Sequence, residues 1–204
     1  MYVPSRFAMP NHADILQFVR QYGFATLISA DFQATHLPLY LDENEGEFGT
    51  LYGHLARANP QAANLHQSTV LAIFTGPHAY ISPRWYGKAP MVPTWNYAAV
   101  HGVGTVTVID DAENARAMAL LVAQYEPDLL QDEQLMPADF QHKLRHAVVG
   151  FKIQIQQWQG KEKLGQHQAP EAQAGVFAQL QQSADPHSQL LAQYMATRNL
   201  GTGQ

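Results

Sequence analysis

The chain has 204 residues and no cysteine, and 12 basic against 17 acidic side chains give it a formal net charge of −5. Apolar residues make up 46% and charged residues 14%, so the chain can bury a core and is neither disordered nor fibrous. The absence of cysteine excludes disulfides, thiolate nucleophiles and cysteine-ligated metals. No apolar run is long enough for a signal peptide or a membrane span, and we expect a cytoplasmic protein.

The charges are unevenly distributed along the chain. The 62 residues from Phe48 to Ile109 contain no Asp or Glu but include Arg57, Arg84, Lys88 and four of the ten histidines. This block therefore carries +3, and the remaining 142 residues carry −8. Such a segment suits an anion-facing role, or consists of core strands that exclude acids.

Helix and strand signals follow one another in a regular order. A first helix begins after Asn11 and ends at Gly23. Apolar and β-branched runs separated by turn residues then predict short strands, and Asn59 and Pro60 predict a short crossover helix over 59–67. The predicted short strands cover 24–30, 34–41, 50–56, 69–76 and 79–82. Strict alternation predicts two long strands, over 101–110 and 147–158, with an amphipathic helix over 111–125 between them.

The composition changes after about residue 160, where Gln, Ala and His become frequent. The pattern of residues 170–198 predicts one or two helices. We therefore predict a mainly β protein, a small antiparallel barrel of Greek-key type with peripheral helices. Its domains are a barrel over 1–168 and a helical extension over 169–204, packed on the barrel or on a partner.

Several catalytic and binding motifs are missing. There is no G-x-S-x-G or P-loop, and the Gly-x-Gly of Gly102 and Gly104 continues into a strand instead of a helix. His142 and His146 are spaced to share a helix face but have no evident third ligand, so we expect a solvated helix end and no metal site. No basic helix stands out, and direct nucleic-acid binding is not expected.

A phosphate site is predicted where a strand runs into the crossover helix. Arg57 lies just before the Asn59 cap, so a guanidinium and free backbone N–H groups would converge at the helix N-terminus. Thr35 and His36 on a neighbouring strand would add hydrogen bonds, or are ordinary half-buried strand residues.

Aromatic and polar residues are concentrated in 76–86 and 92–102. These segments contain Tyr80, Ser82, Arg84, Trp85, Tyr86, Trp95, Asn96, Tyr97 and His101. Such a set forms a slot for a flat ring or packs in the core. Because the aromatics from Trp95 follow Pro93 without strand alternation, we favour the slot. A phosphate site and a ring slot together predict a phosphorylated planar cofactor, FMN or pyridoxal phosphate.

Seven segments in order and spacing resemble a known family, the PaiB-like FMN-binding negative transcriptional regulators. They are MYVPSRF (1–7), FATL (24–27), ATHLP (34–38), GHLARANPQ (53–61), GPHAYISPRWY (76–86), VPTWNYAAVHGVG (92–104) and GKEKLGQH (160–167). The resemblance covers about residues 1–168. It implies a split β-barrel like those of pyridoxamine phosphate oxidases and flavin reductases, which is a homodimer with FMN bound at the subunit interface.

The resemblance also implies roles for individual residues. Its phosphate-binding part corresponds to Thr35, His36, His54, Arg57 and Asn59. The ring wall and dimer seam correspond to Ser82, Trp85, Tyr86, Trp95, Asn96 and Tyr97. The last motif matches at Lys161, Lys163 and Gln166, whereas Gly165 and His167 replace the Ser and Asn that are usual there.

Three functions remain open from the sequence. The first is a dimeric FMN flavoprotein that exchanges electrons with a small donor or acceptor. The second is a transcriptional repressor that acts indirectly or through a partner, and the third is a haem-binding or haem-degrading split barrel. No catalytic residue is assigned, and His101 and Tyr97 are the candidates for a proton donor.

Overall fold

The computed structural model describes residues 1–204, which form two compact units. The first unit contains Met1–Asp14, Thr75–Val100 and Gln159–Gln204, and the second contains Ile15–Phe74 and His101–Trp158. Three long strands, β5, β6 and β7, have residues in both units. No helix combines the length and apolar character needed to cross a membrane.

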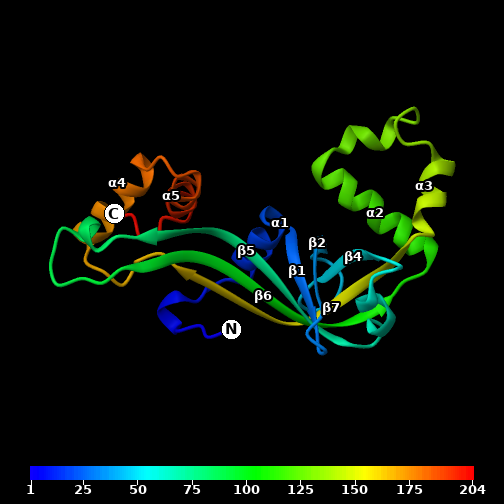
Figure 1. The fold of residues 1–204 in the computed structure, drawn as a ribbon, viewed down its shortest axis with the longest axis horizontal. Coiled ribbons are helices and arrows are strands. Elements are labelled where there is room, and N and C mark those ends of the chain that lie inside the picture. The colour runs from blue at the N-terminus through cyan, green and yellow to red at the C-terminus, as the bar shows by residue number, and fades with distance from the viewer. The chain divides into compact units, whose positions relative to one another are not determined.

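Seven strands and five α-helices make up the regular structure (Figure 1). The strands are β1 (Phe24–Ser29), β2 (Ala34–Pro38), β3 (Tyr40–Asp42), β4 (Thr50–Ala56), β5 (Thr69–Ile81), β6 (Thr94–Val108) and β7 (Val148–Lys163). The helices are α1 (His12–Gln21), α2 (Asp111–Tyr125), α3 (Ala138–Arg145), α4 (Pro170–Gln182) and α5 (Pro186–Arg198). Short 3₁₀ helices occur at η1 (Ser5–Phe7), η2 (Pro60–Asn64), η3 (Pro83–Tyr86) and η4 (Pro127–Gln131).

The strand order shows how the sheet closes in the second unit. The order is β2-β1-β5-β6-β7-β4-β3, so β2 and β3 form the two edges. In the chain these edge strands are separated only by Leu39, which is 1% exposed. The sheet must therefore curl until its edges meet, as in a barrel. Leu27, Leu51, Phe74 and Phe151 are fully buried, as the interior of a small barrel requires.

Close backbone approach is built into the barrel strands. A side chain at Gly102 of β6 would meet the ring of Trp158 of β7 at 2.5 Å. The indole of Trp158 in turn donates a hydrogen bond to the carbonyl of Phe48 at 2.7 Å. Gly102, the first glycine of the Gly-x-Gly that does not form a nucleotide fingerprint, therefore makes room for Trp158.

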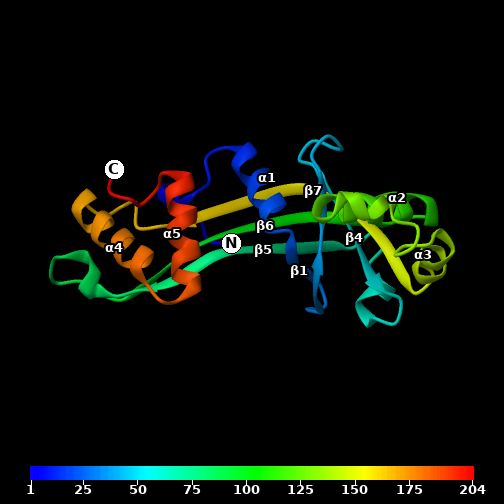
Figure 2. The same ribbon diagram turned by 90° about the horizontal axis from the view of Figure 1, so that it is seen from above.

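Two helices, α4 and α5, pack against each other in the first unit (Figure 2). Each begins with Pro in its first turn, and Asp185 caps α5 by accepting from the backbone N–H groups of His187 and Ser188. Leu180, Leu191 and Met195 are fully buried between and beneath these helices. The prediction of helices over 170–198 is confirmed, and the role of 169–204 stays a prediction.

Several predicted boundaries were wrong. The predicted strand 34–41 breaks at Pro38 into β2 and β3, because Pro has no N–H to continue the ladder. The predicted strands 69–76 and 79–82 are one strand, β5. The strand predicted from 101 begins at Thr94, and that predicted to end at 158 reaches Lys163. The helices over 12–21 and 111–125 and the crossover helix at Pro60 are confirmed, whereas α3 was predicted only as a helix end.

Candidate functional site

Thr35 and Asn59, both predicted to bind phosphate, belong to a hydrogen-bonded cluster of the second unit. The hydroxyl of Thr35 donates to Oε1 of Gln61 at 2.6 Å and accepts from Nδ2 of Asn59 at 2.9 Å. Gln61 is 2% exposed, and its Nε2 also donates to the carbonyls of Leu27 and Gln33 at 3.2 and 3.1 Å. The cluster ties η2 to the β1–β2 hairpin.

The two predicted histidines of this unit have different surroundings. His36 is exposed on β2, where Nδ1 lies 2.9 Å from the hydroxyl of Thr26 and the ring stacks on Phe24. His54 is half-buried on β4, and burial lowers the pKa of its imidazole. His54 is therefore held mainly neutral at pH 7, whereas His36 is open to solvent.

The side chain of Arg57 forms hydrogen bonds to the backbone of the second unit. Its Nε donates to the carbonyl of His146 at 2.9 Å, and its Nη2 donates to the carbonyl of Val148 at 2.8 Å. These bonds fasten the end of β4 to the junction of α3 and β7. A cavity of about 290 Å³ beside Arg57 is also lined by the carboxylates Asp110 and Asp111.

An aromatic cavity lies in the first unit, where the sequence predicts the ring slot. Its volume is about 290 Å³, and the indoles of Trp85 and Trp95 form part of its wall. The other lining residues are His78, Ala79, Tyr80, Asp185, His187 and Ser188. The rings of His78 and His187 stack 5.4 Å apart, and Tyr80 meets Trp95 edge-on at 6.2 Å. The cavity can therefore accept a flat ring and offers two imidazoles.

The other predicted wall residues of the first unit take structural positions. Ser82 caps η3, its hydroxyl accepting from the backbone N–H of Arg84 at 3.3 Å. Tyr86 is buried, and burial raises the pKa of its phenol. Asn96 is 2% exposed, and the ammonium of Lys161 lies over the ring of Tyr97 at 5.2 Å. Of the residues predicted to form the ring slot, the structure brings Tyr80, Trp85 and Trp95 to the aromatic cavity.

The last motif spans the end of β7 and the loop that follows it in the first unit. Lys163 donates to the Thr94 hydroxyl and, at 2.7 Å, to the carbonyl of Trp95. The side chain of Gln166 accepts from the N–H of Leu164 and donates to the carbonyl of Arg6 at 3.3 Å. Lys161 is buried at 8% exposure and donates to the carbonyl of Tyr2. Lys163 thus touches the backbone of a residue that lines the aromatic cavity.

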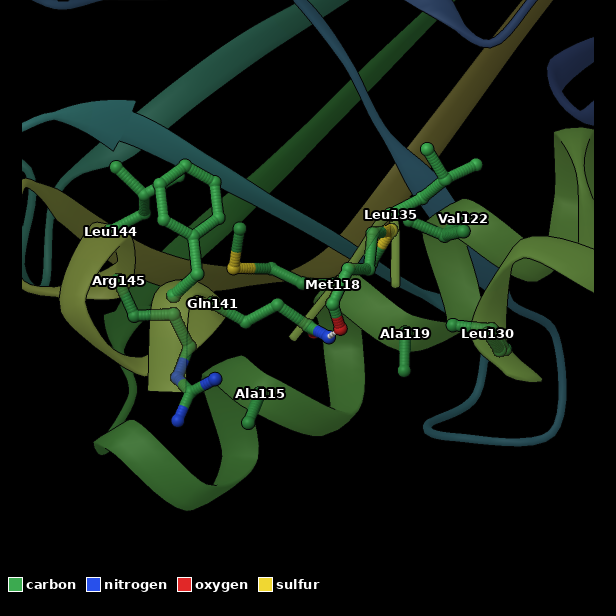
Figure 3. Close-up of a pocket in the computed structure, with 11 residues that line it drawn as sticks. Ala115, Met118, Ala119, Val122, Leu130, Leu135, Gln141, Leu144 and Arg145 are labelled. Atoms are coloured by element: carbon green, nitrogen blue, oxygen red, sulfur yellow. Dashed lines mark hydrogen bonds between the residues drawn. The ribbon is translucent and has the colours of Figure 1, made fainter. Parts of the chain in front are cut away.

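A second, apolar cavity lies between α2, η4 and α3 of the second unit (Figure 3). Its volume is about 220 Å³, and Phe140 is one of its lining residues. Met118 and Leu135 also line it. Its polar side chains are already used: Gln141 donates to the carbonyl of Met136 at 2.7 Å, and Arg145 pairs with Asp111. None of the predicted site residues lines this cavity, which offers no unpaired cation to an anionic ligand.

Sequence reasoning missed three residues that the structure places in these clusters. Gln61 ends the segment GHLARANPQ and follows the Asn59 cap by two residues, so it was detectable, but no role was assigned to it. His78 stands inside the aromatic segment and was therefore detectable. His187 was not, because nothing in its own surroundings links it to a segment that lies more than 100 residues earlier.

The chain is similar to known proteins in its sequence and in its fold. A family model described as "Putative FMN-binding domain" matches residues 1–157. The chain is 34% identical over 203 residues to the protease synthase and sporulation protein PAI 2 of Bacillus subtilis, covering 96% of each chain. It is 29% identical over 185 residues to an uncharacterized protein of Emericella nidulans, with 72% and 74% coverage.

Two solved structures share the fold. The flavocytochrome Anf3 of Azotobacter vinelandii superposes with a TM-score of 0.58 at 15% identity, covering 80% of this chain and 73% of that one. The FAD and heme binding protein of Mycobacterium smegmatis gives a TM-score of 0.58 at 15% identity, with 78% and 74% coverage. At this identity the likeness concerns the fold alone, and it confirms the predicted split β-barrel. With the match to residues 1–157 and to PAI 2, the chain belongs to the PaiB-like family of FMN-binding domains.

Proposed function

We propose that the protein is a homodimeric flavoprotein that holds FMN and exchanges electrons with a small-molecule donor or acceptor. The observation that carries the proposal is the aromatic cavity of the first unit, which has two indoles and two imidazoles on its walls. Flat aromatic surfaces of this kind suit the isoalloxazine ring of a flavin. Family membership supports the same cofactor.

The residues present fit a phosphorylated flavin. The first unit has six Lys and Arg side chains against four Asp and Glu, so its net charge is +2 and it attracts a phosphate. The bound flavin would supply the redox chemistry. Trp85 and Trp95 would orient its ring and exclude water, and His78 or His187 would hold a proton near it.

Exposure of the aromatic residues supports a subunit interface at this cavity. Tyr80 is 47% exposed and Trp95 is 54% exposed, although both are large rings on long strands. Tyr and Trp are enriched where one protein surface meets another. A second copy that covers these rings would complete the flavin site. Sedimentation of the FMN-loaded protein at several concentrations tests this stoichiometry.

Flavin binding is tested by titration of the cofactor-free protein. FMN fluorescence should be quenched in a saturable way, and FMN should be retained after desalting. FAD and haemin, titrated in parallel, show whether the protein prefers the mononucleotide. Unquenched FMN that is lost on desalting would remove this function.

Haem binding is the second candidate, because His78 and His187 offer imidazole ligands in the same cavity. A sharp Soret shift with haemin that disappears in His78→Ala and His187→Ala would favour it over FMN.

A regulatory role, proposed from the family resemblance, would act through a partner or through the redox state of the flavin. The net charge of −5 does not favour DNA contact. A sequence-selective gel shift with the isolated protein would contradict this proposal.

A further inference from the structure

Cations gather around the loop that follows β7 in the first unit. His167 lies between them: the side chain of Gln168 bridges its Nε2, at 3.0 Å, to the ammonium of Lys88, at 3.2 Å. On its other side the ring of Phe7 meets His167 edge-on at 5.3 Å, and the guanidinium of Arg6 lies over Phe7 at 5.2 Å. This basic cluster consists of Arg6, Lys88, Lys163 and His167.

No carboxylate neutralises the basic cluster. Asp14 and Glu162, two of the four acids in the first unit, both pair with Arg198, and Asp185 caps α5. None of the ion pairs in the structure includes a member of the cluster. Partial desolvation and the charges of Arg6, Lys163 and Lys88 lower the pKa of His167, as expected for a site with an excess of positive charge.

Arg57, where the sequence places the phosphate, has different surroundings. The cavity that adjoins its guanidinium is lined by the carboxylates of Asp110 and Asp111. The same cavity is lined by Asn114, whose buried Oδ1 has no hydrogen-bond donor. Acceptors and carboxylates of this kind repel an anion.

We propose that the basic cluster of Arg6, Lys88, Lys163 and His167 binds the phosphate monoester of the ligand whose ring occupies the aromatic cavity. The cluster and the cavity belong to the same unit, and Lys163 joins them through its hydrogen bond to the carbonyl of Trp95. The proposal rests on the proposed flavin binding. It assigns to Arg6, Lys88 and His167 a role in phosphate recognition.

The test compares FMN with riboflavin, which has the same ring and no phosphate. Arg6 and Lys88 are exposed, so Arg6→Gln/Lys88→Gln should fold normally, which thermal unfolding checks. We expect the double variant to bind FMN at least about tenfold more weakly, a loss of about 1.4 kcal/mol, and riboflavin with unchanged affinity. The matched control is Lys143→Gln on exposed α3. Arg57→Gln tests the phosphate position that the sequence predicts. Inorganic phosphate should compete with FMN in the wild type but not in the double variant.

The outcomes separate this inference from the proposed function. Equal weakening of FMN and riboflavin, or no weakening of either, would overturn the phosphate assignment and leave the flavin site in place. Selective loss of FMN in Arg57→Gln but not in the double variant would move the phosphate to the second unit. A wild-type protein that binds neither flavin would overturn the proposed function, and the inference with it.

Discussion

The guanidinium of Arg198 lies 2.7 Å from the carboxylate of Glu162, whose side chain is only 1% exposed. Glu162 also accepts a hydrogen bond from the hydroxyl of Tyr194 at 2.6 Å. Arg198 also forms an ion pair with the carboxylate of Asp14, at 2.8 Å. One arginine at the end of α5 therefore joins the last helix to β7 and to the start of α1. The sequence motif GKEKLGQH points to the lysines on either side of Glu162, but Glu162 is more deeply buried than either lysine.

Arg198→Met should destabilise the protein by about 3–5 kcal/mol, because it leaves the Glu162 carboxylate buried without its cation. Urea unfolding at pH 7 measures the change. The control is Arg84→Met, which removes an exposed cation of the same unit and should leave the stability nearly unchanged. If the two variants unfold at the same urea concentration, the ion pair contributes no measurable stability.

Thr35→Val should lower stability without changing the preference for FMN over riboflavin. The substitution leaves Oε1 of Gln61 and Nδ2 of Asn59 without their shared partner, at a cost of about 1–3 kcal/mol. Thermal unfolding measures the stability, and fluorescence titration measures the two affinities. Thr105→Val, on β6, is the matched control because the Thr105 hydroxyl has a weaker, exposed bond to Gln156. A selective loss of FMN in Thr35→Val would return this residue to the phosphate site.

Burial patterns explain which strands could be predicted from the sequence. Val100 and Val106 point inward along β6, and such apolar residues at alternate positions allow the strand to be predicted from the sequence. The same alternation continues back to Thr94, but one inward position there is Asn96, which is 2% exposed. Because a buried asparagine reads as polar, the periodicity fails in the sequence although it holds in space. The sequence therefore does not predict a strand in the segment from Trp95.

The prediction divides β5 into two strands because of a proline. Gly76 and Pro77 form a turn signal, yet the strand continues through them to Ile81. The pairing of β5 with β1 extends from Val70 to Phe74, so Pro77 lies beyond the part of the strand that β1 requires. A missing N–H is tolerated where no neighbour needs it. The sequence alone does not reveal where a neighbouring strand ends.

The sequence predicts some of the residues at the candidate site, but not which distant residues they contact. Trp85 and Trp95 were identified from their own segments and do meet at one cavity. Arg57 fits a phosphate motif equally well, but its carbonyl partners come from residues about 90 positions later. Local spacing carries no information about such partners. The basic cluster likewise combines Arg6, Lys88 and His167 from three distant segments.

His54 should make the stability depend on pH. Burial lowers the pKa of its imidazole in the folded state, so below about pH 6.5 the unfolded chain binds a proton that the folded chain does not. The stability of the wild type should therefore fall as the pH decreases from 7.5 to 5.5, by at most about 1.4 kcal/mol per pH unit from this residue. Urea unfolding of the wild type and of His54→Gln measures the difference. Identical pH profiles would show that His54 is protonated equally in both states.

Trp95→Ala should impair flavin binding more than it impairs folding. Because Trp95 is 54% exposed, its removal costs little burial, and the melting temperature should change only slightly. The loss of a ring-sized wall from the aromatic cavity should weaken both FMN and riboflavin by about tenfold, or about 1.4 kcal/mol. Phe140→Ala, 55% exposed at the apolar cavity of the second unit, is the matched control. Equal affinities in the two variants would place the flavin ring elsewhere.

FMN binding should be accompanied by proton uptake at His167. Partial desolvation and three neighbouring cations lower the pKa of this imidazole in the free protein. A bound phosphate would offset that positive charge and raise the pKa toward its usual value, so a proton enters from the buffer. Calorimetric titration near pH 6 in buffers with different ionisation enthalpies measures the number of protons taken up.

His167→Asn places the residue that is usual in this motif at the same position and removes the titrating group. It should therefore bind FMN with less proton uptake than the wild type, whereas riboflavin should show no difference between the two proteins. The comparison with riboflavin excludes proton changes caused by the ring, and the comparison between proteins excludes those of the phosphate itself. Equal uptake of protons by both proteins on FMN binding would mean that His167 does not sense the phosphate, and would remove it from the basic cluster.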